Sequence, residues 1–310
     1  MIKKEKIKKI LVIRNDRFGE FLLNIPALLA LRETYPQARI VLAVSGIVNE
    51  LAGLLDCVDE VVIWDEIKKE LKKHKFDLSV SLNPLKEANL KCFFAGIPFR
   101  LGYDRKWGYL LTHKLKDTKH LGNRHEVDCN LELVRLAGAE TKNKSISINV
   151  DKVYFPQFLK NKLIAIHPFT SDPIKQWPLE RFKELAMRIE KELNLNVIII
   201  GLSLAEFITD GNAIDMTNKT SLPELAALLK CCALLISGDS GPVHLAAAVG
   251  VPVIALFRSD IPGKCALRWG PWGEGHSVIE KINLRDIRVD EVMGLVKEKY
   301  VLEKGIGRFR

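Results

Sequence analysis

The stretch 236–257 reads ISGDSGPVHLAAAVGVPVIALF and decides how this chain folds. An apolar run over 233–237 predicts a buried strand, the small residues of 244–249 predict a helix, and 251–257 predicts a second strand. The glycine-rich turn over 238–241 therefore follows the carboxyl end of a strand and precedes a helix. Ligands of open α/β sheets bind at that edge of the sheet.

The turn over 238–241 has the features of an anion-binding site. Free N–H groups at the start of a helix attract negative charge together with the helix dipole, and glycine lets the backbone approach a ligand closely. Further polar groups at the same place come from Asp239, Ser240 and His244. The same sequence also fits an ordinary turn in which Asp239 or Ser240 caps the helix, so the turn alone leaves both interpretations open.

Short apolar strands alternate with helical segments on both sides of this stretch. Strands are expected at 8–14, 39–45, 60–64, 78–82, 163–166 and 196–201, and helices at 21–34, 47–55, 67–73, 127–136, from Pro178 onward, at 225–232 and at 289–302. Alternation of this kind is typical of βαβ units around a mostly parallel sheet. The sequence therefore predicts the α/β class, with two facing Rossmann-like domains and a cleft between their strand ends.

Length and composition agree with two domains. The chain has 310 residues, of which 47% are hydrophobic, enough for two buried cores. We place the domains at 1–152 and 153–310, because 145–158 combines a proline with mixed polar residues. The terminal helix is expected to pack back on the first domain.

Cysteine spacing and hydropathy predict a cytoplasmic protein. The six cysteines form no CxxC pair and no zinc-type spacing, as expected for small buried side chains in a reducing compartment. The first residues lack the pattern of a signal peptide, and no apolar run reaches the length of a transmembrane helix.

The net charge of +9 is concentrated in part between residues 100 and 125. Three aromatic residues, Tyr103, Trp107 and Tyr109, are interleaved with the basic ones. Such a segment suits an anionic partner, either a phosphorylated glycolipid, an acidic membrane face or a nucleic acid. A solvated lysine-rich surface explains the same composition equally well. The basic residues of the segment are Arg100, Arg105, Lys106, Lys114, Lys116, Lys119 and Arg124.

Two further loops carry chemistry-bearing side chains. Glu20 lies in the first turn of the helix expected after the first strand, where the helix dipole favours its ionised form, and an ionised carboxylate can accept a proton from a substrate hydroxyl. Asp16 is the alternative candidate for that role.

In the second half, Thr170 and Ser171 can donate to phosphate oxygens, and Lys175 supplies a positive charge for a diphosphate. Incidental helix-start and surface residues are the alternative for both loops.

Several common motifs are absent from the sequence. There is no GxGxxG after the first strand and no GxxxxGK[ST], which argues against nicotinamide, flavin and P-loop enzymes. No Asp-x-Asp pair occurs either. If the chain catalyses a glycosyl transfer, Lys175 and backbone dipoles would then stabilise the leaving diphosphate. We expect neither a cofactor nor a metal.

Three segments together resemble the family 9 glycosyltransferases, the ADP-heptose:lipopolysaccharide heptosyltransferases. They read ILVIRNDRFGEFLLNIPALLALRETYPQARI, IAIHPFTSDPIKQWP and LLISGDSGPVHLAAAVGVPVIALF, and RWGPWG near the end is similar to the Tyr-Gly-Pro region of the family. The resemblance implies a GT-B fold, an acceptor-binding first domain and a nucleotide-sugar-binding second domain. It also implies metal-independent, inverting transfer of heptose from ADP-heptose to a lipid A–Kdo inner core acceptor.

The family roles carry over position by position. Glu20 stands at the place of the proposed general base, where the family often has Asp, and the donor diphosphate contacts correspond to Thr170, Ser171 and Lys175. The donor-binding turn corresponds to Asp239, Ser240, Gly241 and His244, with Ser240 in place of a frequent Thr. Thr220 matches a nucleoside contact. Glu206 lies near a ribose-binding acid, with the spacing off by about one residue.

The resemblance implies an ADP-heptose donor and an anionic glycolipid acceptor at the inner face of the cytoplasmic membrane, with the enzyme peripheral there and no nucleic acid bound. Two alternatives stay open. One is a GT-B transferase or epimerase that uses another nucleotide sugar, since no residue pattern selects adenine over uracil. The other is a basic, non-enzymatic nucleic-acid-binding protein, which leaves the turn and the two loops without a purpose.

Overall fold

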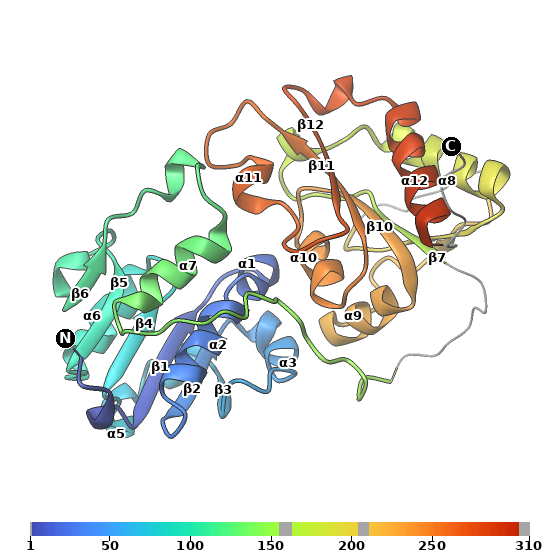
Figure 1. Cartoon of the computed structure of the whole chain (residues 1–310). Helices are drawn as coiled ribbons and strands as arrows, with labels where there is room; N and C mark the ends of the chain where they lie inside the picture. The colour runs from blue at the N-terminus through green and yellow to red at the C-terminus, as the bar shows by residue number, and fades with distance from the viewer. Residues whose placement is uncertain (1, 155–162, 204–210, 304–310) are drawn as a thin grey trace. The chain divides into compact units, whose positions relative to one another are not determined.

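A computed structural model describes residues 2–154, 163–203 and 211–303 of the chain. The chain divides into two compact units, Met1–Asn149 and Val150–Arg310. The boundary expected between residues 152 and 153 falls just inside the second of these units. Figure 1 shows a sheet flanked by helices in each unit.

The first unit is a parallel six-stranded sheet in the order β3-β2-β1-β4-β5-β6. Parallel pairing of β1 with β2 runs from Lys9↔Arg39 to Arg14↔Val44. The strands are β1 (Lys9–Arg14), β2 (Arg39–Val44), β3 (Glu60–Ile63), β4 (Leu78–Ser81), β5 (Phe99–Tyr103) and β6 (His113–Leu115). The helices are α1 (Phe18–Leu22), α2 (Ile25–Thr34), α3 (Asn49–Ala52), α4 (Trp64–Ile67), α5 (Leu71–His74), α6 (Lys86–Phe94) and α7 (Glu126–Arg135), with short 3₁₀ turns η1 (Lys4–Lys6), η2 (Gly46–Val48), η3 (Gly108–Leu110) and η4 (Lys119–Leu121).

The second unit repeats this topology. Its sheet has the order β12-β11-β10-β7-β8-β9, again with parallel pairs. The strands are β7 (Leu163–His167), β8 (Asn196–Ile199), β9 (Ile214–Asp215), β10 (Cys232–Gly238), β11 (Val253–Arg258) and β12 (Ser277–Lys281). The helices are α8 (Leu179–Leu193), α9 (Leu222–Lys230), α10 (Gly241–Ala248), α11 (Ala266–Trp269) and α12 (Val289–Glu303), with 3₁₀ turns η5 (Pro173–Lys175) and η6 (Leu284–Asp286).

Both strand orders are the doubly wound order 3-2-1-4-5-6 when each sheet is numbered from its own first strand. The order reverses between β1 and β4 in the first sheet and between β7 and β10 in the second. Each reversal is a topological switch point, where the loops leaving two neighbouring strands diverge and open a crevice at the carboxyl edge. The fold thus assigns one ligand-binding edge to each unit.

Most predicted elements are present, and the differences have local causes. The helix expected over 21–34 is interrupted, because the Asn24 side chain donates to the carbonyls of Glu20 at 2.6 Å and Phe21 at 3.1 Å and Pro26 has no N–H for the helical ladder. Pro178 is the N-cap of α8 rather than its first residue. Helix α9 begins with a capping box, in which Ser221 and Glu224 are bonded reciprocally.

The terminal helix α12 packs within its own unit. Its buried side chains Val292, Met293 and Val296 join the core cluster that includes residues of α8 and β11. Four of the six cysteines are buried as expected, whereas Cys231 is exposed and Cys265 is half-buried. Within the described residues, no helix combines the length and apolar character that a membrane crossing requires.

Candidate functional site

At the switch point of the first sheet, the buried side chain of Arg14 connects three segments. It lies at the end of β1, and its Nε donates to Asp16 Oδ1 at 2.7 Å. Its Nη1 donates to the Leu82 carbonyl just beyond β4 at 3.3 Å and lies 3.6 Å from Glu126 Oε1 at the start of α7. This arginine therefore fixes the loop that leads from β1 into α1.

Behind Arg14 lies a second buried ion pair. Lys119 Nζ is 2.6 Å from Glu126 Oε1, and both side chains are almost wholly buried. Burial lowers the pKa of Lys119, although Glu126 opposes the shift, and Lys119 Nζ also lies 4.3 Å from the ring centroid of buried Tyr103. Lys119 is thus part of the interior and not of a basic surface.

The two candidate bases, Asp16 and Glu20, have different surroundings. The Asp16 carboxylate is held by Arg14; burial raises its pKa, with the neighbouring Glu20 acting in the same direction and Arg14 against it. Glu20 lies in the first turn of α1, as predicted, and pairs with exposed Arg17 at 2.5 Å. The partner of Glu20, Arg17, is exposed, whereas the partner of Asp16, Arg14, is buried.

At the switch point of the second sheet, three side chains form a hydrogen-bonded cluster. Parallel pairing places His167 of β7 opposite Ser237 of β10, with His167 Nδ1 3.0 Å from Ser237 Oγ. Ser240 Oγ lies 3.1 Å from the same nitrogen and 2.8 Å from Ser237 Oγ. Burial lowers the pKa of His167 to about 4, so the ring is neutral near pH 7 and can accept a hydroxyl hydrogen.

This cluster bears on whether Ser240 caps the helix. Ser240 is the N-cap residue of α10, but its side chain makes no capping hydrogen bond; it is directed to His167 and Ser237 instead. The Ser240 hydroxyl therefore leaves the first-turn N–H groups of α10 to other partners. Capping by the Ser240 side chain is therefore wrong, while N–H groups at a helix start are suited to binding an anion.

Lys175 and Asp239 meet beside the same turn. Lys175 Nζ lies 2.5 Å from Asp239 Oδ2, and the two side chains are largely buried. A Cβ atom on Gly238 would lie 3.3 Å from the Lys175 carbonyl oxygen, so the loop carrying Lys175 runs close to the glycine of the turn. The structure thus unites the two motifs that the sequence singled out separately in this half of the chain.

Glycine is required at one further position of this edge. Gly201, just beyond β8, has φ +125°, and a Cβ there would lie 2.6 Å from His167 Cδ2. A side chain at residue 201 would displace the imidazole that holds Ser240.

The other predicted donor contacts lie at the same carboxyl edge. Thr170 turns back on its own loop, where its hydroxyl accepts the Asp172 N–H at 3.2 Å, and Ser171 is exposed. Thr220 is half-buried and directly precedes the N-cap of α9, while His244 is buried in α10. Glu206 lies outside the described residues.

Two charged pairs of this edge were not predicted from the sequence. Asp172 caps η5 and is 3.3 Å from Lys264 Nζ, and Arg258 at the end of β11 pairs with Asp260 and donates to the Ile174 carbonyl. His167 and Ser237 were also given no role. Each is the polar last or near-last residue of an otherwise apolar strand, and that pattern is the signal that could have identified them.

The basic segment 100–125 does not form one charged surface. Arg100 donates to the carbonyls of Leu110 and Ile97, and Lys119 is buried. Arg105 pairs with Asp117, and Arg124 with Glu132. The seven cations of the segment therefore have different surroundings: Lys119 is buried, while exposed Arg105 and Arg124 form ion pairs, so neither interpretation of the segment is decided by charge alone.

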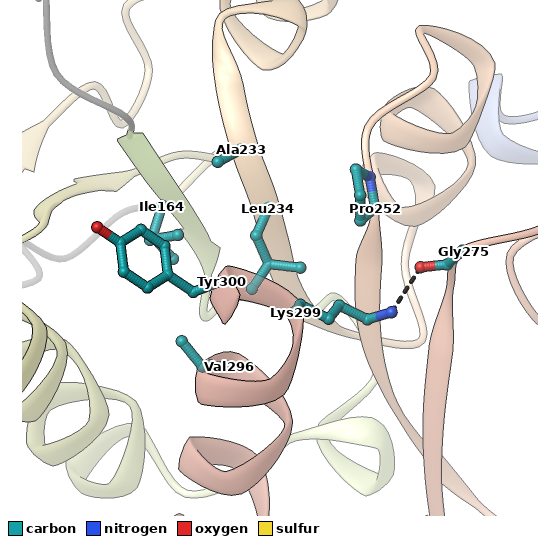
Figure 2. A pocket seen from close by; sticks show the side chains of 8 residues that line it. All are labelled: Ile164, Ala233, Leu234, Pro252, Gly275, Val296, Lys299 and Tyr300. Carbon is teal, nitrogen blue, oxygen red and sulfur yellow. Dashed lines mark hydrogen bonds between the residues drawn. The ribbon is translucent and has the colours of Figure 1, made fainter. Parts of the chain in front are cut away.

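An apolar cavity of about 290 Å³ lies at the opposite edge of the second sheet (Figure 2). It is lined by the first residues of strands and by α12, with Lys299 Nζ donating to the Gly275 carbonyl at 2.6 Å. None of the predicted site residues lines it. Among the described residues, no group of three or more His, Cys, Asp or Glu side chains is arranged to hold a metal ion.

Known proteins resemble this chain along most of its length. The family model for glycosyltransferase family 9 (heptosyltransferase) matches residues 64–291. The lipopolysaccharide core heptosyltransferase OpsX of Haemophilus influenzae is 25% identical over 303 residues, which cover 89% of this chain and 85% of the relative.

Solved structures share the fold. The glycosyl transferase family 9 protein of Veillonella parvula has a TM-score of 0.81 at 20% identity, covering 96% of this chain and 97% of its own. The E. coli ADP-heptose lps heptosyltransferase II has a TM-score of 0.79 at 21% identity, covering 96% and 99%. These matches confirm the predicted class of two Rossmann-like domains of the GT-B type. The chain belongs to glycosyltransferase family 9 (heptosyltransferase), and the protein is a glycosyltransferase.

Proposed function

We propose that this protein transfers heptose from ADP-heptose to the inner core of lipopolysaccharide, on a lipid A–Kdo acceptor. The observation that carries the proposal is the meeting of Lys175, Asp239 and Ser240 at the switch point of the second sheet. The H. influenzae relative is a lipopolysaccharide core heptosyltransferase and the E. coli structure is an ADP-heptose lps heptosyltransferase, which supports this choice of donor and acceptor.

In this proposal the second domain, 153–310, binds the donor. The diphosphate lies against Lys175 and the first turn of α10, with Thr170, Ser171, Gly241 and His244 around it. Ser240 donates to a phosphate oxygen, and Thr220 contacts the nucleoside. Asp239 orients Lys175 through their ion pair at 2.5 Å. Glu206 remains a proposed ribose contact.

The first domain, 1–152, binds the acceptor, and Glu20 is the general base. Glu20 takes the proton of the attacking hydroxyl while the acceptor oxygen forms a bond to the anomeric carbon of heptose. The bond from that carbon to the β-phosphate oxygen breaks, and ADP leaves with the electron pair. Such a single displacement inverts the anomeric configuration. Lys175 and the α10 dipole stabilise the charge that grows on the departing ADP, so the step needs no metal ion or cofactor.

The acceptor is an anionic glycolipid, which places the reaction at the inner face of the cytoplasmic membrane with the enzyme bound peripherally. Nucleic acid is not a substrate in this proposal.

A nucleotide panel tests the donor assignment. ADP, UDP and GDP are each added at the same concentration, and the unfolding temperature is measured; a ligand at a hundred times its Kd stabilises by about 2.7 kcal/mol. We expect a rise with ADP alone, followed by transfer of heptose from ADP-heptose to a delipidated core oligosaccharide, detected by mass. Stabilisation by UDP and not by ADP contradicts the donor assignment and favours another nucleotide sugar.

A further inference from the structure

Large apolar side chains are exposed together on α6 and on the loop that contains η3. Phe93 and Phe94 end α6 and are 44% and 71% exposed, and Trp107 and Tyr109 are 37% and 69% exposed. We call these four residues the α6 surface. Exposed apolar residues are usually scattered singly, and a contiguous group marks a site of interaction.

Contacts connect α6 to the loop that contains η3. Lys86 Nζ of α6 lies 4.0 Å from the Trp107 ring centroid, and the Arg100 guanidinium lies 5.3 Å from that of Phe93. The ring centroids of Trp107 and Tyr109 are 6.4 Å apart. The loop thus runs alongside the helix and adds its aromatic rings to those of α6.

Backbone strain accompanies the exposure of Trp107. Lys106 and Trp107 have φ values of +53° and +67°, in the left-handed region that residues with a Cβ seldom adopt. The Lys106 carbonyl accepts the Asn89 Nδ2 hydrogen at 3.0 Å, which ties the strained pair to α6. Strain of this kind costs about 1–3 kcal/mol per residue and is typical of functional positions.

Lysines surround the apolar side chains. Lys86 lies over the Trp107 ring, and Lys86, Lys91 and Lys106 are all exposed; Lys91 lies one helical turn before Phe94. The acidic side chains nearby are engaged: Glu87 pairs with Lys68 at 3.0 Å, and Asp104 accepts the Asp117 N–H at 2.9 Å. The α6 surface therefore presents aromatic rings with positive charge around them.

We propose that the α6 surface binds the face of an anionic phospholipid bilayer. Aromatic rings enter the boundary between headgroups and acyl chains, while the lysines extend to lipid phosphates. A phosphate-rich polymer would be met by the lysines but would leave Phe94 in water, so charge and apolar exposure together favour the bilayer. The inference rests on the proposed function only in that the acceptor is a membrane glycolipid.

Vesicle sedimentation tests the proposal with a matched pair of variants. Phe93→Ser/Phe94→Ser/Trp107→Ser removes the apolar side chains, and the control Val278→Ser/Ile282→Ser/Leu179→Ser removes side chains of nearly the same exposure, 42%, 69% and 40%, from the second unit. On vesicles of phosphatidylcholine mixed with phosphatidylglycerol, we expect the first variant to bind at least about tenfold more weakly than wild type and the control to bind like wild type. Unchanged unfolding temperature and ADP affinity show that each variant is folded.

The contribution of the lysines around the α6 surface is tested separately. Lys86→Gln/Lys91→Gln/Lys106→Gln should lose about fivefold in affinity per lysine on the anionic vesicles and little on phosphatidylcholine alone. Three results would overturn the proposal. They are an equal loss of vesicle binding in both triple-serine variants, no vesicle binding by the wild type, and binding of the wild type to RNA in place of vesicles.

Transfer to a delipidated acceptor separates this inference from the proposed function. If vesicle binding does not depend on the α6 surface while transfer persists, only the membrane surface is wrong. If vesicle binding depends on it and no transfer occurs, only the proposed reaction is wrong.

Discussion

Replacing Lys175 with methionine tests the donor site most directly. The methionine side chain keeps nearly the length and the apolar stem of lysine, but the positive charge beside the turn is lost. A hydrogen bond to a charged group contributes about 1.5–3 kcal/mol, which corresponds to about a 10- to 150-fold rise in the Kd of ADP. Lys175 is largely buried next to Asp239, so little solvent screening reduces this effect.

Asp239 is affected by the same substitution. In Lys175→Met its carboxylate loses the partner at 2.5 Å and faces the incoming diphosphate as a like charge. The double variant Lys175→Met/Asp239→Asn removes that repulsion, and its affinity for ADP should therefore lie between those of wild type and Lys175→Met. The two substitutions are coupled because their side chains are in contact.

Isothermal titration calorimetry with ADP measures all three proteins. Lys191→Met is the control, because Lys191 is an exposed lysine near the opposite end of α8 and should leave the Kd unchanged. A Kd for Lys175→Met within about twofold of wild type would refute the role assigned to Lys175, since the loss of even a weak hydrogen bond to a charged group raises a Kd by about tenfold.

Three further outcomes follow from the two sites. Glu20→Gln should lower kcat by about 10²–10⁴-fold with ADP affinity unchanged, and near-normal turnover of ADP-heptose would remove Glu20 from its role. Because the folded-state pKa of His167 is depressed to about 4 from 6.5, its contribution to stability is present above pH 6.5 and lost as pH falls toward 4; between pH 7.5 and pH 5 it amounts to roughly 2 kcal/mol. Urea unfolding at both pH values should show this loss in wild type and a smaller one in His167→Gln; equal losses would contradict it. Lys119→Met should destabilise the protein by about 3 kcal/mol, because buried Glu126 loses the ammonium that lies 2.6 Å from its carboxylate, whereas exposed Lys116→Met should change the unfolding free energy little.

The donor edge was predictable because its evidence is local. An apolar strand followed by Gly-Asp-Ser-Gly and a small-residue helix indicates a strand, turn and helix in that order, and parallel strands bring all their carboxyl ends to one edge. Lys175 and Asp239 could therefore be placed at the same edge. That they form an ion pair required the distance between their atoms.

The basic segment 100–125 shows where local evidence fails. A list of lysines and arginines does not say which of them face water, and burial of Lys119 depends on Glu126 at the start of another helix. Conversely, the exposed ring of Phe94 belongs to α6, and the periodicity of the sequence did not predict that helix. For that reason the sequence left two interpretations of the segment open, and it did not separate buried Lys119 from the exposed cations.

The sequence by itself determined the α/β class, the alternation of strands and helices, and the loops that carry Glu20, Lys175 and Asp239, because periodicity and turn chemistry act between near neighbours. Only the tertiary structure decided strand order, and with it the partners of each side chain. His167 meets Ser237, 70 residues away, because β7 and β10 are adjacent in register, and Arg14 meets Leu82 because β1 and β4 are adjacent. Contacts of this kind depend on how strands pair across the sheet, which no local pattern of residues specifies.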